Sequence, residues 1–134
     1  MMDGQLIALY QRVADIGLPC MIGGSVGAMF YGEPRATLDI DLIIDASSQH
    51  VEAIIAAFPA EQFYLPPPAV IRHELARGAQ GMFNVFDHAS CLKLDLYPAG
   101  DDPLIRWGLE HRRPREVEGG TVMVAPAESL SRNP

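Results

Sequence analysis

Two aspartates, Asp39 and Asp41, interrupt the apolar run TLDIDLII at residues 37–44. If this run is a strand, successive side chains point to opposite faces, so both carboxylates lie on one face with their Cα atoms roughly 6–7 Å apart. Removing a carboxylate from water is costly unless a cation or hydrogen bonds compensate its charge. A solvated pair at an exposed edge would avoid that cost, but the large aliphatic neighbours favour a central strand. We therefore predict that the pair binds a positive charge, and we favour a divalent metal ion.

A third aspartate, Asp95, lies in the later run CLKLDLY at residues 91–97. The leucines of this run alternate with polar residues, so Lys93, Asp95 and Tyr97 share the face opposite the leucines. Three carboxylates on adjacent strands can hold two Mg²⁺ ions, which stabilise the attacking and leaving oxygens of a phosphoryl displacement. In this interpretation Asp39 and Asp41 ligate both ions. Asp95 binds the ion nearer the incoming hydroxyl and accepts its proton as general base.

A glycine-rich turn, Gly23-Gly24-Ser25, precedes the aspartate pair and joins a short apolar segment to a predicted helix. Glycines let the backbone approach a ligand closely, and the free N–H groups at a helix start bind phosphate. Two glycines before a helix are also often only a tight turn, so this signal is weak alone. Beside the aspartates, it predicts that Gly23, Gly24 and Ser25 bind phosphate.

These residues need a sheet to position them, and the hydrophobic pattern predicts one. It indicates a single domain over residues 1–134, of the α/β (α+β) class, with a mixed β-sheet flanked by helices. Helices are predicted at residues 3–17, 25–31, 47–58, 68–77, 102–112 and from 126. Strands are predicted at 20–22, 37–44, 62–65, 82–86, 91–97, 115–118 and 121–124. The short loops predict that 82–86 pairs antiparallel with 91–97, and that 115–124 forms a hairpin.

Composition limits the classes of function. Of the 134 residues, 49% are hydrophobic and 20% charged, which is typical of a soluble globular protein. The formal net charge of −7 does not favour general nucleic-acid binding through a broad basic face. No apolar stretch approaches the roughly 20 residues of a membrane span, and no signal segment is recognisable. We expect a cytoplasmic protein with no membrane contact.

Several other reactive side chains have ordinary interpretations. Cys20 and Cys91 lie in apolar runs and are predicted to be buried free thiols, because two cysteines do not make a disulfide framework. The four histidines lack the spacing of a zinc site and are predicted to lie at the surface or at helix ends. A basic patch is predicted to be a solvated face that pairs with nearby glutamates, although an anionic partner could use it. It consists of Arg106, Arg112, Arg113 and Arg115.

Taken together, these motifs resemble a known superfamily. The run GGSVGAMFYG at 23–32, followed by R-x-T-x-D-x-D at 35–41, is similar to the signature of the polymerase-β-like nucleotidyltransferases. The similarity is closest to their small bacterial branch, which includes minimal nucleotidyltransferases and AbiEii-like toxins. The family pattern ends with a third acidic residue on a later strand, and KLDL at 93–96 supplies it. The resemblance extends over nearly the whole chain and implies the polymerase-β-like nucleotidyltransferase fold.

The resemblance also implies an activity. Members of this superfamily transfer a nucleoside monophosphate from an NTP, such as ATP, to an acceptor hydroxyl and release pyrophosphate. The implied cofactor is Mg²⁺, as two ions, with Mn²⁺ as a substitute. The implied acceptor is a tRNA or a protein, in the setting of a toxin–antitoxin pair, and the implied partners are an antitoxin or a second copy of the chain.

The resemblance assigns roles to individual residues. By position, Gly24 and Ser25 hold the triphosphate, while Asp39, Asp41 and Asp95 ligate metal and form the catalytic set. Two further residues, Arg35 and Thr37, match the family's Arg-x-Thr. Arg35 contacts phosphate, or instead pairs with Glu33 or caps a loop. Lys93 contacts phosphate or instead forms an ion pair with Asp95.

Two alternatives remain open. One is transfer to a small molecule, as in the antibiotic-modifying relatives, and the other is a catalytically inactive nucleotide-binding domain. Related chains usually continue into C-terminal helices, whereas this sequence stops at Pro134. We expect the lack of that helical extension to affect activity and base selectivity and to expose an apolar surface that a second subunit could cover.

Overall fold

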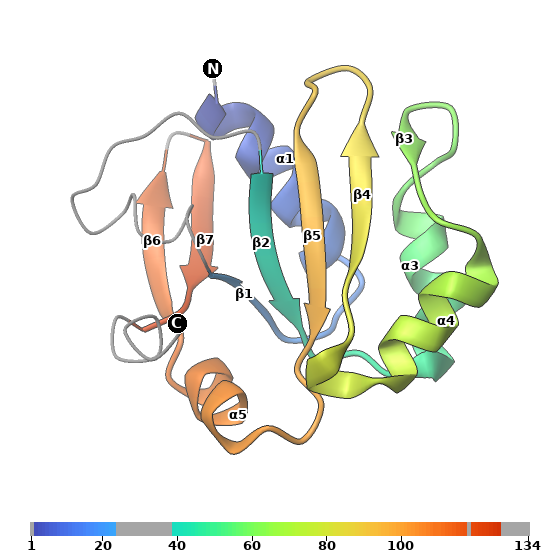
Figure 1. Ribbon diagram of the computed structural model, residues 1–134. Coiled ribbons are helices and arrows are strands. Elements are labelled where there is room, and N and C mark those ends of the chain that lie inside the picture. The colour runs from blue at the N-terminus through green and yellow to red at the C-terminus, as the bar shows by residue number, and fades with distance from the viewer. Residues whose placement is uncertain (1, 24–38, 118, 127–134) are drawn as a thin grey trace.

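The computed structural model describes residues 2–23, 39–117 and 119–126. A seven-stranded sheet of mixed direction, with strand order β3-β4-β5-β2-β1-β7-β6, crosses the molecule (Figure 1). Its strands are β1 (Cys20–Gly23), β2 (Asp39–Ile44), β3 (Phe63–Tyr64), β4 (Phe83–Asp87), β5 (Lys93–Pro98), β6 (Arg113–Val117) and β7 (Gly120–Val124). The β2–β5 and β1–β7 pairs are parallel, and the other neighbouring pairs are antiparallel. The predicted mixed α/β architecture is confirmed.

Helices cover one face of this sheet. They are α1 (Met2–Ala14), α3 (Val51–Ala57) and α4 (Pro68–Ala76), and the short 3-10 turns η1 (Ser48–His50) and η2 (Gly78–Gln80) adjoin α3 and α4. Figure 1 shows α1 behind the central strands. The alternating aliphatic residues of β2 and β5, such as Leu42 and Leu94, are buried against the apolar sides of these helices. Burial of this face is the main source of stability for the sheet.

A smaller apolar cluster lies on the opposite face of the sheet. There α5 (Pro103–Glu110) packs Leu109 against Met21, and Ile43 of β2 adjoins the same cluster. The Asp102 side chain accepts a hydrogen bond from the backbone N–H of Ile105, 3.0 Å away, and so caps the start of α5. In Figure 1, α5 lies at the end of the sheet where β2 and β5 finish. The starts of these two strands, where the aspartates lie, are therefore away from α5.

The predicted elements agree with the observed ones wherever the structure describes them, apart from small shifts at their ends. The predicted helices at 25–31 and from 126, and strand residues 37–38, lie outside the described residues. The described helices include none that is long and apolar enough to cross a membrane.

The two cysteines differ from each other. Cys20 is buried, as predicted, and burial raises the pKa of its thiol, so it is protonated at neutral pH. The prediction for Cys91 is wrong, because this residue is exposed and precedes the strand, which begins at Lys93. Its φ of 63° and the 2.8 Å hydrogen bond from its backbone N–H to the Asp87 carbonyl place it in a tight turn. A left-handed turn residue cannot follow the in-and-out alternation of a strand.

Candidate active site

The parallel pairing of β2 with β5 brings two of the predicted site residues together. Asp41 and Asp95 are direct partners in the register of these strands. Paired positions on neighbouring strands point to the same face and lie about 4.8 Å apart. Both side chains are half-buried, on the face opposite the aliphatic core. Two carboxylates from distant parts of the chain therefore meet at the centre of the sheet.

A third side chain, Asn84 of β4, completes this group. Asn84 is the register partner of Asp95, and its Nδ2 donates a hydrogen bond of 2.5 Å to Asp95 Oδ1. The bond fixes the orientation of the Asp95 carboxylate and leaves its other oxygen for a second partner. Sequence reasoning did not select Asn84. The available signal was a polar residue in the otherwise apolar run MFNVF at 82–86.

The first residue of the predicted phosphate turn lies on the other side of Asp41. Gly23, the last residue of β1, is the register partner of Asp41 in the antiparallel β1–β2 pair. Four neighbouring strands thus contribute one row of positions, namely Gly23, Asp41, Asp95 and Asn84. Because glycine has no side chain, the position beside the Asp41 carboxylate is not filled by one. The other predicted phosphate-binding residues, Gly24, Ser25, Arg35 and Thr37, lie outside the described residues.

The next row of the same face contains Lys93, which is half-buried and is the register partner of Asp39. Lys93 lies two positions before Asp95 on β5, so both side chains point to one face. The backbone of Asp39 is part of β2, whereas its side chain lies outside the described part of the chain. The predicted contact of Lys93 with phosphate stays a prediction.

The donor atoms present suit a hard divalent cation. Carboxylate oxygens are preferred by Mg²⁺ and Mn²⁺, and two of them converge here. Among the described residues, no group of three or more His, Cys, Asp or Glu side chains is arranged to hold a metal ion. The described pair therefore supplies part of the three-carboxylate set that the sequence predicts, and Asp39 would supply the rest.

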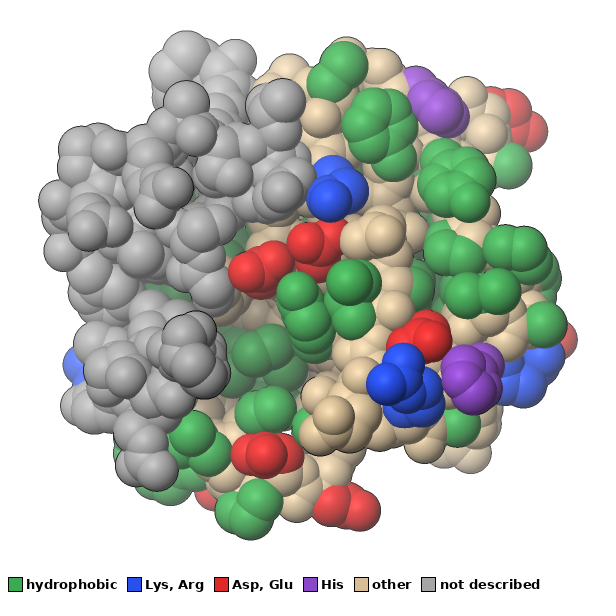
Figure 2. Space-filling view, in the orientation of Figure 1, with side chains coloured by type: hydrophobic (Ala, Val, Ile, Leu, Met, Phe, Trp, Pro, Cys, Tyr) green, Lys and Arg blue, Asp and Glu red, His purple; other side chains and the backbone are tan. Residues whose placement is uncertain are grey.

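The face that carries this group is seen in Figure 2. Acidic side chains lie together near its middle with a basic one beside them, and apolar side chains gather over β3 and β4.

The predicted basic patch is partly used within the molecule: Arg106 forms a 2.9 Å ion pair with Asp45, and Arg112 donates a 2.5 Å hydrogen bond to the Leu109 carbonyl. These contacts favour the structural interpretation of the patch, and the acidic partner of Arg106 is Asp45 rather than one of the predicted glutamates.

Comparison with known proteins supports the fold. No protein-family model and no curated protein sequence matches the chain. Among solved structures, the chain is similar to a Thermotoga maritima protein described as a candidate nucleotidyltransferase, with a TM-score of 0.60 and 13% sequence identity. The match covers 95% of this chain and 78% of that one. The expected nucleotidyltransferase-like fold is thereby confirmed, while membership of the superfamily and the branch within it stay predictions.

Proposed function

From this fold and site, we propose that the protein is a divalent-metal-dependent nucleotidyltransferase. It would move a nucleoside monophosphate from an NTP to an acceptor hydroxyl and release pyrophosphate. The observation that carries the proposal is the register pairing of Asp41 with Asp95, on the face of the sheet opposite the core formed with α1, α3 and α4. Two half-buried carboxylates side by side repel each other, and a bound cation would offset that repulsion.

Each residue of the site has a role in the proposed reaction. Asp41 and Asp39 hold the metal ions, and Asp95 accepts the proton of the acceptor hydroxyl. The hydroxyl oxygen attacks the α-phosphorus and forms the new P–O bond, while the bond to the bridging oxygen breaks and pyrophosphate leaves with its electron pair. Two bound Mg²⁺ ions, or Mn²⁺ in their place, would stabilise the charge on the attacking and leaving oxygens.

Asn84 and the glycine turn act on either side of the carboxylates. Asn84 is a positioning residue, since it orients Asp95 through the hydrogen bond between them. Gly23, with Gly24 and Ser25, would hold the triphosphate on the β1 side of Asp41. Arg35, Thr37 and Lys93 are proposed as further phosphate contacts.

The proposal is tested by label transfer. The protein is incubated with each α-labelled NTP in Mg²⁺ or Mn²⁺, together with total RNA, a cell lysate or the protein alone as acceptor. Asp41→Asn and Asp95→Asn are each expected to lower the rate about a hundredfold or more, because each removes several kcal/mol of transition-state stabilisation. Asp101→Asn is the matched control, since Asp101 is an exposed carboxylate in the loop between β5 and α5, outside the strand positions that carry Asp41 and Asp95. It is expected to leave transfer unchanged.

Two outcomes would contradict the proposal in different ways. If nothing is labelled but NTP with Mg²⁺ still raises the melting temperature, the chain is a nucleotide-binding domain without transferase activity. If the melting temperature does not respond either, the nucleotide-binding alternative fails as well. Label on a small molecule of the lysate, with none on RNA or protein, would favour the small-molecule alternative.

The acceptor and the biological setting are also part of the proposal. We favour an RNA or protein acceptor, with the chain acting in the cytoplasm as the toxin of a toxin–antitoxin pair. A neighbouring gene for an antitoxin-like protein, and rescue of growth when that protein is co-expressed, would support this setting. Unimpaired growth on overexpression of an active enzyme would argue against it.

A further inference from the structure

A row of aromatic residues continues the candidate active-site face beyond the carboxylates. Tyr64 of β3 is the register partner of Phe86 of β4, and Phe86 is the partner of Lys93 of β5. Direct partners share a face of the sheet, so these three side chains lie on the same face as Asp95. The strands β3 and β4 bring the aromatic residues to the side of β5 away from β2.

Two of these aromatic rings are in contact, and Tyr64 on the neighbouring strand is exposed. Tyr64 is 55% exposed, the largest value among the exposed large hydrophobic residues in the described part of the chain. Phe86 is half-buried, and its ring meets that of His88 edge to face, with 5.6 Å between the ring centroids. Scattered exposed aromatics are ordinary on protein surfaces. Here Phe86 and His88 are in ring contact beside a candidate catalytic site, and Tyr64 is the strand partner of Phe86.

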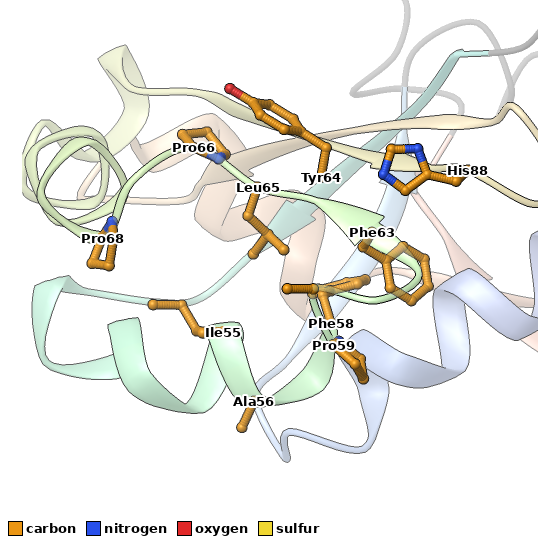
Figure 3. Close-up of a pocket in the computed structure, with 11 residues that line it drawn as sticks. Ile55, Ala56, Phe58, Pro59, Phe63, Tyr64, Leu65, Pro66, Pro68 and His88 are labelled. Atoms are coloured by element: carbon orange, nitrogen blue, oxygen red, sulfur yellow. The ribbon is translucent and has the colours of Figure 1, made fainter.

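A groove continues from these rings around the edge of the sheet. It has a volume of about 600 Å³, and Tyr64 and His88 lie at its border together with Phe63 and Leu65. Figure 3 shows that the side chains of Tyr64, in β3, and of Leu65, directly after it, point in opposite directions. The buried Phe63 is held by edge-to-face contact with Phe58, at 5.2 Å between ring centroids. The packed rings beneath β3 therefore support a strand that presents Tyr64 outward.

The aromatic row is within reach of the reacting atoms. Phe86 is one strand away from Asp95 and two residues beyond its partner Asn84, so the Cα atoms of Phe86 and Asp95 are about 8 Å apart. Gly23, beside which the triphosphate is proposed to bind, lies on the opposite side of Asp41. The rings are therefore on the side from which the acceptor hydroxyl must approach.

We infer that Tyr64, Phe86 and His88 form a stacking platform for an unpaired base at the end of a single-stranded RNA acceptor. The inference rests on the proposed function for the direction of approach, and it names the acceptor class. Aromatic rings stack on any base, and such recognition suits single strands, whose bases are unstacked. With a net charge of −7, the chain cannot rely on broad phosphate attraction, so the stacked bases must supply most of the affinity.

The test measures binding without turnover. A labelled ten-nucleotide single-stranded RNA is titrated with the full chain in the absence of NTP, and fluorescence anisotropy gives the Kd. Tyr64→Ala is expected to weaken binding about tenfold, whereas Tyr64→Phe keeps the ring and stays within about twofold of the parent. Trp107→Ala is the matched control, because Trp107 is an exposed aromatic on α5 that lies outside the platform. An abasic strand of equal length is expected to bind about tenfold more weakly than the normal strand.

Several results would overturn the inference. The parent and Tyr64→Ala could bind the RNA equally well, or Trp107→Ala could weaken binding as much as Tyr64→Ala does. The abasic strand could bind as tightly as the normal strand, or the parent could fail to bind the RNA at all. If Tyr64→Ala weakens NTP binding in a parallel titration and leaves RNA binding intact, the rings hold the base of the NTP instead. Label transfer is a separate readout, so the platform and the proposed activity can fail independently.

Discussion

At the scale of single residues, the hydrogen bond between Asn84 and Asp95 organises the candidate site. Asn84 Nδ2 lies 2.5 Å from Asp95 Oδ1, and its second contact is the Met82 sulfur at 3.5 Å. A side chain that orients a metal-binding carboxylate affects metal affinity although it touches no metal itself. The orientation of the Asp95 carboxylate therefore depends on a residue eleven positions earlier, on the adjacent strand.

We predict that Asn84→Ala raises the Mn²⁺ concentration needed for half-maximal label transfer about tenfold, because the Asp95 carboxylate loses its fixed orientation. The measurement is a Mn²⁺ titration at saturating NTP. Gln62→Ala is the matched control, since Gln62 also donates an amide hydrogen bond to an aspartate, Asp87, outside the site. An equal shift in both variants would mean that Asn84 acts only through general stability.

At the scale of elements, the junction between α4 and β4 holds the platform strands in place. Glu74 of α4 accepts hydrogen bonds from the backbone N–H of Met82 at 3.1 Å and from Arg77 at 2.9 Å. Gly81 passes so close to α4 that a Cβ at this position would lie 1.9 Å from the Glu74 carbonyl oxygen. The chain can enter β4 in this direction only because residue 81 has no side chain.

Gly81→Ala is expected to lower the free energy of unfolding by about 2 kcal/mol or more, because the backbone must shift to relieve the contact with Glu74. Urea denaturation gives the value. Gly4→Ala is the matched control: no atom lies within 4 Å of a Cβ at this position in α1, and alanine favours a helix. It is expected to be neutral or to stabilise by up to about 1 kcal/mol. A small loss for Gly81→Ala would contradict the close approach.

The same junction predicts a dependence on pH. The hydrogen bond from Met82, followed by the charge of Arg77, lowers the pKa of the Glu74 carboxyl. The carboxylate therefore stabilises the folded state above the unfolded pKa, and this contribution disappears as the pH falls through the lowered folded pKa. We expect Glu74→Gln to be less stable than the parent at pH 7, with a difference that shrinks toward pH 3, as measured by thermal unfolding. A constant difference over that range would contradict this prediction.

At the scale of the whole molecule, the central strands carry both the core and the candidate site. β2 and β5 present Asp41 and Asp95 on one face and fully buried aliphatic residues such as Leu42 and Leu94 on the other. The core therefore keeps the two strands in register, and the register keeps the carboxylates together. Loss of core packing at this point weakens the fold that positions the site.

Leu94→Ala is expected to lower the free energy of unfolding by about 2–5 kcal/mol, since it leaves a cavity beneath the central strand. For a domain of this size, that is a large part of the total stability. Val70→Ala is the matched control, because Val70 is 43% exposed on α4, and it is expected to change stability by less than about 1 kcal/mol. Equal effects in urea denaturation would contradict the assignment of the core.

Much of this arrangement could be predicted because it is encoded locally. The alternation of leucines with polar residues at 91–97 shows which face of the strand carries Asp95. The short loop after residue 86 and the Gly119-Gly120 turn determine which neighbours pair antiparallel. Cys91 was mispredicted because hydrophobicity alone does not reveal a residue with positive φ.

The sequence by itself determined the polar residues of the site face, the core faces of the strands and the type of most elements, since these depend on periods of two or 3.6 residues. Only the tertiary structure decided that β2 lies beside β5 in a register that pairs Asp41 with Asp95. It alone brought Asn84 to Asp95 and aligned Tyr64 and Phe86 with Lys93. The physical reason is that pairing between distant strands follows from burying all the apolar faces together, and no local pattern specifies it.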